Sequence, residues 1–244
     1  MKENLMNDNY KGDNIPVIGG IILVFFTIII YFVLHQMRFI NREFLDINIF
    51  IIPIIGMMGL LDDMVGDKES QGLRGHLSSL FKGRLTTGIF KVIITIILST
   101  IVSIQESEHI IYLLVINSAI IILMTNFLNL LDLRPGRSIK VFLIISFILI
   151  SLDINNILYF LPFFIVFLIY LPYELRGRVM LGDSGANLLG AVLGYNTIIL
   201  INGLPMKLFI MVILFFFNII SEKISFTEVI SNNRVLRWID RIGR

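Results

Sequence analysis

Long apolar segments alternate with short polar ones along most of the chain. Taking about 17–25 mostly apolar residues as one membrane span, and allowing a shorter fifth segment, the pattern predicts eight helices. They cover residues 15–34, 45–61, 86–104, 109–131, 139–152, 157–173, 184–201 and 205–221. The sequence therefore predicts an all-α, polytopic integral membrane protein with about eight transmembrane helices.

The composition supports this fold class. Hydrophobic residues make up 56% of the 244 residues, charged residues make up 16%, and the mean hydropathy is +0.87, which is far outside the range of soluble domains. Cysteine is absent, which excludes disulfides, thiolate catalysis and cysteine metal sites. No domain boundary appears, so residues 1–244 are predicted to form one multi-span domain that ends in a basic, amphipathic cytoplasmic tail, residues 222–244.

The distribution of basic residues predicts the orientation. Cytoplasmic loops of membrane proteins are enriched in Lys and Arg. If the N-terminus is cytoplasmic, every Lys and Arg except Arg38, Arg42 and Lys207 lies on the cytoplasmic side. Lys91, a few residues inside its span, is expected to extend its side chain to that same surface. Both termini and the longer polar loops are therefore predicted to be cytoplasmic.

Two adjacent acids, Asp62 and Asp63, end the second apolar segment. The C-terminus of a helix carries partial negative charge, and adjacent carboxylates repel each other, so this position costs free energy. A divalent cation relieves the repulsion, and Mg²⁺ suits one or two carboxylates together with substrate phosphates. The alternative is solvated charge that marks the end of a span. We favour a functional pair, because a basic loop that contains glycines follows.

A polar stripe runs along the end of the fourth segment. Asn126, Asn129 and Asp132 are spaced three residues apart, so they lie on one face of an otherwise apolar helix. Buried Asn side chains can also simply join two helices by hydrogen bonds. The stripe by itself leaves both interpretations open.

The sequence LRPGRSIK that follows is rich in cations. Pro135 and Gly136 predict a turn, and Arg134, Arg137 and Lys140 surround it with donors that suit phosphate. The alternative role of these cations is anchoring at the cytoplasmic surface, which requires charge but no particular order. Our hypothesis is a phosphate-facing turn at the membrane surface.

A third acidic motif, LGDSGANLLG, opens the seventh segment. Taken alone, Asp183 is an ordinary N-cap residue. However, it is predicted to lie on the same side of the membrane as the other two motifs. If these acids cluster in three dimensions, the cluster would explain all three acidic motifs.

In order along the chain, these motifs resemble those of the polyprenyl-phosphate N-acetylhexosamine-1-phosphate transferases, the glycosyltransferase family that includes phospho-N-acetylmuramoyl-pentapeptide transferase. NIPVIGGI at 14–21 is similar to the family's first cytoplasmic loop, and GLLDD at 59–63 to its paired aspartates. NFLNLLD at 126–132 matches the pattern Asn-x-x-Asn-x-x-Asp, and GDSGANLLG at 182–190 matches the Gly-Asp-x-Gly loop. Each motif is weak alone, but four in family order are fairly specific.

The resemblance implies an Mg²⁺-dependent phosphoglycosyl transferase, with Mn²⁺ as the alternative metal. It implies transfer of a sugar-1-phosphate from a UDP-sugar to undecaprenyl phosphate or a similar polyprenyl phosphate, which starts a cell-envelope glycopolymer. The implied catalytic and metal-binding residues are Asp62, Asp63 and Asp183. The residues expected to bind substrate are Asn126, Asn129 and Asp132 from the resemblance, with Arg134, Arg137 and Lys140 from the cationic turn.

The expected partners are therefore a polyprenyl phosphate lipid, a UDP-sugar and the lipid bilayer, with a homodimer left open and no nucleic acid. The expected location is the bacterial plasma membrane, crossed several times, with the active site facing the cytoplasm. Phosphoryl transfer requires mainly positioning and charge neutralisation, which acids, a metal ion and arginines supply.

The chain also departs from the family pattern. Family members typically have ten spans, whereas eight are predicted here, and LRPGR replaces the glycine that many members carry after Asn-x-x-Asn-x-x-Asp. The family's cytoplasmic loop with paired histidines has no counterpart. Only His35, His76 and His109 are present, and of these only His76 is predicted to be cytoplasmic. These departures leave the identity of the donor sugar open.

The tail is predicted to form an amphipathic helix that lies on anionic lipid, because apolar residues alternate with arginines there. The apolar positions are Val235, Leu236, Trp238, Ile239 and Ile242. The alternative is a retention signal or a plain anchor.

Two other functions remain open at this point. A transporter or flippase for a phosphorylated lipid would use the same cations, but it is expected to show inverted repeats and polar groups near mid-membrane, whereas these acids lie at the ends of spans. A catalytically inactive scaffold for envelope assembly is the other, and the missing histidines and spans favour it.

Overall fold

The computed structural model describes residues 5–9, 11–65, 86–221 and 223–243. A helix forms in each of the eight predicted segments, which confirms the all-α fold class. The long helices are α1 Gly19–Gln36, α2 Arg42–Val65, α4 Thr87–Gln105, α5 Ile111–Leu131, α6 Arg137–Leu152, α7 Ile157–Leu175, α8 Gly182–Leu200 and α9 Leu204–Ser221. His76 and most of the basic loop before α4 lie outside the described residues.

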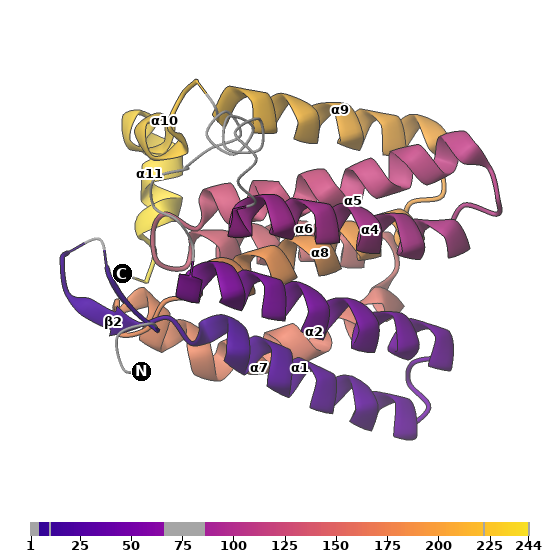
Figure 1. Ribbon diagram of the computed structural model, residues 1–244, viewed down its shortest axis with the longest axis horizontal. Helices are drawn as coiled ribbons and strands as arrows, with labels where there is room; N and C mark the ends of the chain where they lie inside the picture. Colours follow the sequence, from indigo (N-terminus) through magenta and orange to yellow (C-terminus); the bar gives the residue numbers. More distant parts are fainter. Residues whose placement is uncertain (1–4, 10, 66–85, 222, 244) are drawn as a thin grey trace.

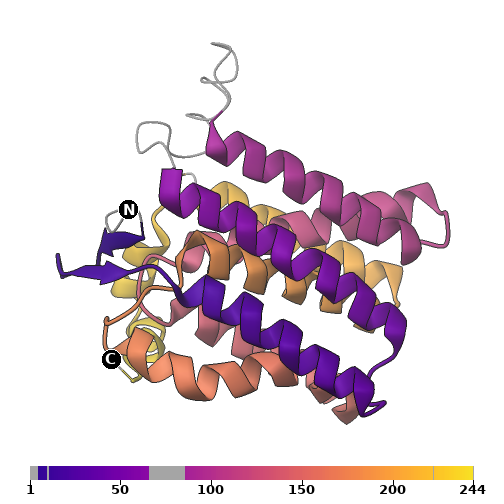
Figure 2. The same ribbon diagram turned by 60° about the horizontal axis from the view of Figure 1, so that its bottom comes forward.

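The long helices run side by side along one direction and form a bundle (Figures 1 and 2). Successive helices run in opposite directions, so α2, α5, α7 and α9 end where α1, α4, α6 and α8 begin. We name this end, which carries Asp62, Asp132 and Asp183, the motif end, and the other the opposite end. All three acidic motifs therefore gather at one end of the bundle, as predicted.

Among the described residues, six helices are long and apolar enough to cross a membrane: α1, α2, α4, α5, α7 with its preceding turn, and α9. The helix α6 has only 16 residues. The helix α8 is the central one, with almost all its residues buried against α1, α2, α5 and α6. Because neighbouring helices shield α8 from lipid, it can carry polar residues such as Asn187 and Asn196. The total of eight spans stays a prediction.

The N-terminal residues form a β-hairpin rather than the start of a helix. Strands β1 (Met6–Asp8) and β2 (Asn14–Pro16) pair antiparallel, so α1 begins at Gly19, four residues later than the predicted span. The chain then runs beside the loop that precedes α8: the Met180 amide donates to the Pro16 carbonyl, and the Gly19 amide donates to the Met180 carbonyl. The hairpin thus supports the loop that carries the Gly-Asp-Ser-Gly motif.

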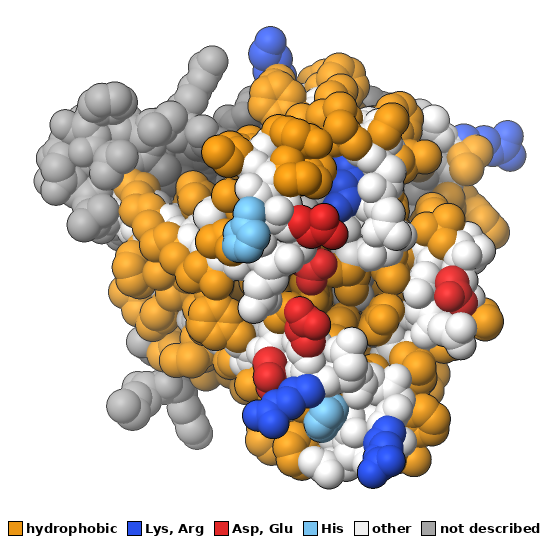
Figure 3. All heavy atoms as spheres, turned by 90° about the vertical axis from the view of Figure 1, so that its right-hand side faces the viewer, with side chains coloured by type: hydrophobic (Ala, Val, Ile, Leu, Met, Phe, Trp, Pro, Cys, Tyr) orange, Lys and Arg blue, Asp and Glu red, His pale blue; other side chains and the backbone are white. Residues whose placement is uncertain are grey.

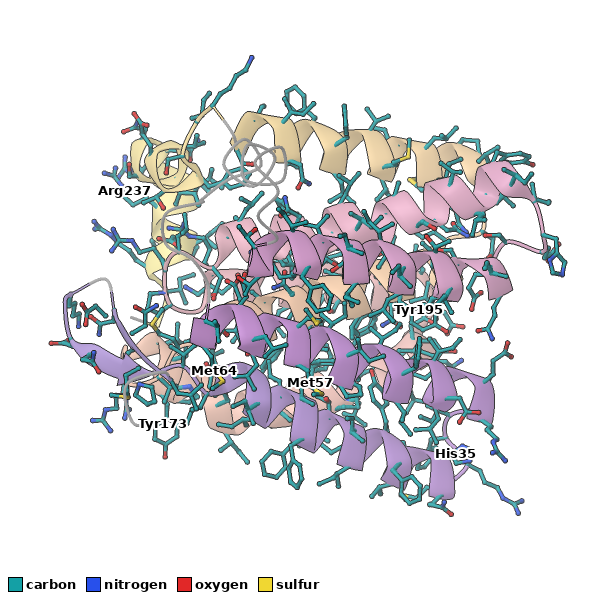
Figure 4. All side chains as sticks on the ribbon, in the orientation of Figure 1. His35, Met57, Met64, Tyr173, Tyr195 and Arg237 are labelled. Carbon is teal, nitrogen blue, oxygen red and sulfur yellow. The ribbon has the colours of Figure 1, made fainter. Side chains whose placement is uncertain are left out.

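The opposite end has its own polar groups. Figure 3 looks onto this end, where acidic side chains gather near the middle and cations lie around them. Lys207 is buried there, and its Nζ donates to Asn117 Oδ1 at 3.1 Å. Burial raises the pKa of Glu106 above its ordinary value, and the nearby charge of Glu43 adds to the effect. Figure 4 places Tyr195, whose hydroxyl donates to Glu106, in this half of the bundle.

Two short helices follow α9: α10 (Phe226–Asn232) and α11 (Arg234–Arg241). Both lie at the motif end, and α11 runs across the direction of the bundle helices (Figure 1). The predicted helix in the tail is therefore confirmed, although it is short.

Candidate active site at the motif end

An ion-pair cluster joins three helices at the motif end. Lys91, near the start of α4, lies with its Nζ 2.6 Å from Asp62 Oδ2 in α2 and 2.5 Å from Asp183 Oδ2 in α8. The Thr87 hydroxyl donates to the other oxygen of Asp62 at 2.6 Å. The side chains of Lys91 and Asp62 are only 15% and 16% exposed. One ammonium group is therefore shared by two acids from different motifs.

Asp63 has a different role from Asp62. Its Oδ1 accepts from the Asp183 amide at 2.9 Å and its Oδ2 accepts from the Ser184 amide at 3.1 Å. The first amides of a helix have no partner within the helix and carry partial positive charge, so a carboxylate there is stabilised. Asp63 thus fixes the N-terminus of α8 against α2. We call Asp62, Asp63, Lys91 and Asp183 the carboxylate cluster.

The backbone before Asp183 also requires a specific residue. Gly182 has φ +72°, a left-handed conformation that favours glycine, and a Cβ at this position would lie 2.8 Å from Asp63 Oδ2. The N-cap of α8 is Leu181, and Asp183 lies within the first turn. The interpretation of Asp183 as an ordinary N-cap is therefore wrong, because its side chain turns to Lys91 instead.

Asp132, the C-cap residue of α5, lies beside a second buried acid. A small cavity of about 40 Å³ is lined by Asp132, Arg134 and Glu174, together with residues of the loop before α8. Burial raises the pKa of Asp132 above its ordinary value, and the negative charges of Glu174 and Asp183 add to this. The Asn-x-x-Asn-x-x-Asp motif thus ends near the carboxylate cluster.

Glu174, at the end of α7, holds the cationic turn in place. It is 1% exposed, and its Oε1 accepts from the Gly136 amide at 2.6 Å. Gly136 has φ +71°, so the predicted turn at Pro135 and Gly136 is confirmed. This turn leads directly into α6.

Two of the three predicted phosphate-binding cations bind the tail. Arg137 is 4% exposed, and its Nε and Nη2 donate to the two carboxylate oxygens of Asp240 at 2.9 and 3.3 Å. Lys140 Nζ donates to the carbonyls of Ile239 and Asp240 at 3.1 and 2.7 Å. Only Arg134 lines the cavity beside Asp132. A substrate-binding role for Arg137 and Lys140 stays a prediction.

The two asparagines of the stripe have separate environments. Asn126 donates from Nδ2 to Asn218 Oδ1 in α9 at 2.5 Å, which is the helix-joining role considered above. Asn129 Oδ1 is buried and has no hydrogen-bond partner within the described part of the chain. Buried polar atoms normally have a partner. The Oδ1 atom of Asn129 can therefore still accept a hydrogen bond from a substrate.

A groove opens beside the carboxylate cluster. It has a volume of about 600 Å³ and lies between α4, α5, α8 and α9, and most of its lining surface is apolar. Its polar lining includes Lys91, Asn126 and Asn187. Val92 and Phe215, which are 50% and 56% exposed, also line it, so the groove opens on the apolar outer surface of the bundle.

The acids do not converge as a three-carboxylate metal site. Within the described ranges, no group of three or more His, Cys, Asp or Glu side chains is arranged to hold a metal ion. Asp62 and Asp183 do contact one shared cation, the Lys91 ammonium, whereas both oxygens of Asp63 accept from backbone amides. Two carboxylates with substrate phosphates are a donor set that Mg²⁺ uses. Asp62 and Asp183 are the two carboxylates that meet at one cation, whereas Asp63 is directed to the backbone of α8.

A comparison with protein families bears on this arrangement. A family model described as glycosyl transferase family 4 matches residues 45–201, more than half of the chain. The chain belongs to glycosyl transferase family 4. This family 4 protein is thus a transferase that couples a phosphosugar to a lipid phosphate. The matched region contains the whole carboxylate cluster and the cationic turn, and it excludes α1, α9 and the tail. Searches of curated proteins and of solved structures gave no match.

Sequence reasoning missed two residues of this family 4 site. Lys91 was expected to extend to the membrane surface at the motif end, but its pairing with two acids there was not predicted. The signal was a lysine inside an apolar segment, because a charge there requires a partner. Glu174 also carried a signal, as an acid at the end of the sixth apolar segment. Its partner, the Gly136 amide, lies 38 residues away along the chain and has no signal of its own.

Proposed function

We propose that this family 4 transferase moves a sugar-1-phosphate, of the N-acetylhexosamine type, from a UDP-sugar to a polyprenyl phosphate. One observation carries the acceptor side of the proposal: Lys91 belongs both to the carboxylate cluster and to the lining of the apolar groove. A lipid phosphate needs an apolar surface for its chain next to a charged site for its headgroup. The groove and the cluster provide these two surfaces side by side.

On this proposal, an oxygen of the lipid phosphate attacks the sugar-linked phosphorus of the donor. A new P–O–P bond forms, the bond between the two donor phosphates breaks, and UMP leaves with the electron pair. Lys91 lies near the headgroup and offsets the charge that accumulates on the phosphate oxygens. Asp63 keeps the start of α8 in place, so it acts as a positioning residue.

We assign the donor to the part of the site that contains Asp132, next to the carboxylate cluster. Asp132 and Arg134 line one small cavity, and the Asn129 acceptor lies three residues earlier on α5. Guanidinium groups suit the diphosphate, and amide and carboxylate oxygens accept from sugar hydroxyls or uracil. Asn126 faces the groove and joins α9, so we assign it to the acceptor side.

Asp62 and Asp183 are the residues proposed to hold Mg²⁺, with Mn²⁺ as an alternative. A bound divalent ion supplies Lewis-acid stabilisation of phosphate charge. The distribution of basic residues supports an orientation of the site toward the cytoplasm, and the proposed location is a bacterial plasma membrane. The product would start a cell-envelope glycopolymer.

Radiolabel transfer tests the proposal. Purified protein in detergent receives undecaprenyl phosphate, Mg²⁺ and one of a panel of labelled UDP-sugars. Asp62→Asn and Asp183→Asn are compared with Asp46→Asn, a matched control whose carboxylate is 61% exposed and pairs with Arg42. We expect labelled lipid from the wild type and from the control, and loss of at least about a hundredfold in the two site variants.

The two alternatives predict different results. A transporter or flippase moves a phosphorylated lipid across vesicles without forming labelled product, and an inactive scaffold does neither. Folded wild-type protein that forms no labelled lipid from any donor would contradict the proposal. Product formation that survives both Asp→Asn changes would contradict the assignment of the site.

A further inference from the structure

The tail helix α11 has a composition unlike the rest of the bundle surface. It is eight residues long and alternates arginines with large apolar residues. Asn233 starts it, because its Oδ1 accepts from the amides of Val235 and Leu236. This cap allows a short helix to form at a defined position next to the membrane-spanning part of the chain.

The helix has two distinct faces. At 100° per residue, Trp238, Val235, Ile239 and Leu236 occupy one arc, and Arg234, Arg237 and Arg241 occupy another. Trp238 is 68% exposed and Val235 is 64% exposed. Figure 4 shows that Arg237 points away from the bundle. Large apolar side chains and cations are thus exposed together on one short helix.

The bundle holds α11 at a fixed level. The Arg137 and Asp240 side chains are 5% and 14% exposed and form the ion pair described above, while Lys140 binds carbonyls in the last turn of α11. A cation at a helix C-terminus is favourable. Both anchors lie in the first turn of α6, which starts at the motif end. The helix α11 is therefore held beside the ends of the membrane-spanning helices.

We propose that α11 binds the surface of the membrane through anionic phospholipids. Three observations support this partner: α11 runs across the bundle direction, it follows the span α9 after only the short helix α10, and arginines border its apolar residues. A helix of this kind lies in the interface, with its apolar side chains below the headgroups and its cations among them. This function is separate from the chemistry of the transferase site.

The chain offers a direct probe, because Trp238 is its single tryptophan. The full-length protein is reconstituted into vesicles of phosphatidylcholine alone or of an equal mixture with phosphatidylglycerol. Trp238 fluorescence is then measured with lipids brominated on their acyl chains and, separately, with acrylamide in the water. We expect stronger quenching by brominated lipid and weaker quenching by acrylamide in the mixed vesicles.

Variants that remove arginines test whether anionic phospholipid is the partner of α11. Arg234→Gln with Arg237→Gln should reduce the ratio of bound to free tail by about fivefold per arginine in the mixed vesicles. Arg38→Gln with Arg42→Gln removes the same charge at the opposite end and should have no effect. Quenching that is independent of lipid charge would overturn the proposal. A Trp238 shielded from both quenchers would also overturn it and would point to a second copy or another protein.

Discussion

At the scale of single residues, Lys91 has the most informative position. Its ammonium group is the shared partner of Asp62 and Asp183, which come from two different motifs. A buried charge without a partner is costly, so each of these three residues depends on the other two. The cluster therefore couples stability to the site, and stability and activity must be measured separately.

We predict that Lys91→Met lowers transferase kcat/KM by about a hundredfold or more, because the phosphate charge loses its nearest ammonium. The variant should also have a lower melting temperature, since two acids lose their counter-charge. Adding Asp62→Asn to Lys91→Met should restore part of the melting temperature and none of the activity. Wild-type activity in a folded Lys91→Met variant would contradict this prediction and would show that Lys91 only extends to the membrane surface.

Arg137 and Asp240 allow the direct and indirect roles of a cation to be separated. If Arg137 acts only by holding the tail, Asp240→Asn should reproduce the effect of Arg137→Ala on donor KM. The double variant should then add little to either single change. We expect this result, because the Arg137 side chain is already bound by Asp240 and Thr227. A large donor KM effect in Arg137→Ala alone would indicate direct contact with the donor.

Arg134 is the cation of the turn that is expected to contact the donor directly, because it lines the cavity beside Asp132. Arg134→Ala is expected to raise the donor KM by about tenfold, the effect of losing one charge-assisted hydrogen bond, while membrane insertion is unchanged. Donor titrations of initial transfer rate measure this. An unchanged KM would show that Arg134 only anchors the turn to the membrane surface.

At the scale of elements, glycines bring α8 close to its neighbours. A Cβ on Gly20 of α1 would meet Ser184 and Gly185, and a Cβ on Gly59 of α2 would meet the backbone of Asp183 and Ser184. Small residues let helices approach closely where lipid gives no hydrophobic drive for association. The close contact of α2 with α8 is what lets Asp63 reach the amides of α8.

Gly59→Ala tests this contact. The added methyl group meets backbone rather than a flexible side chain, so we expect a loss of about 1–3 kcal/mol in the free energy of unfolding. The melting temperature in detergent should fall, and transfer activity should fall with it. Gly203→Ala is the control, because no atom lies within 4 Å of a Cβ there. Equal melting temperatures for the two variants would contradict the packing argument.

At the scale of the whole molecule, the bundle separates two polar ends by an apolar middle. The motif end holds the carboxylate cluster and the tail, and the opposite end holds Lys207, Asn117 and Glu106. The groove between α4, α5, α8 and α9 extends from the cluster along the apolar part of the bundle. Its position connects the charged site to the lipid phase.

Filling the groove should therefore weaken the binding of the lipid acceptor and leave the binding of the donor unchanged. Leu123→Trp adds volume to the groove wall, and we expect the KM for the lipid acceptor to rise by about tenfold with little change in the donor KM. Ile97→Trp is the control, because Ile97 is 48% exposed on α4 and does not line the groove. Acceptor titrations in detergent measure the effect. Similar acceptor KM values in both variants would remove the groove from the lipid-binding site.

The amino-acid pattern was enough to predict the helices and the end of the bundle where each motif lies. Apolar runs of span length are local features, and alternating helix direction places every second segment end on one side. Three motifs could therefore be assigned to one membrane surface: Asn126–Asp132, the end of the segment that carries Asp62, and the loop that carries Asp183. The turn at Pro135 and Gly136 followed from local conformational preference as well.

The partners of the charged groups became known only from the packing of the helices. Lys91 and Asp183 are 92 residues apart, and Arg137 and Asp240 are 103 residues apart, so no local pattern links them. Their pairing depends on which helices pack together, which is set by small residues and shape along whole helix faces. The distinct roles of Asp62 and Asp63 have the same cause: neighbours in sequence point in different directions from a helix, one toward α4 and one toward the start of α8.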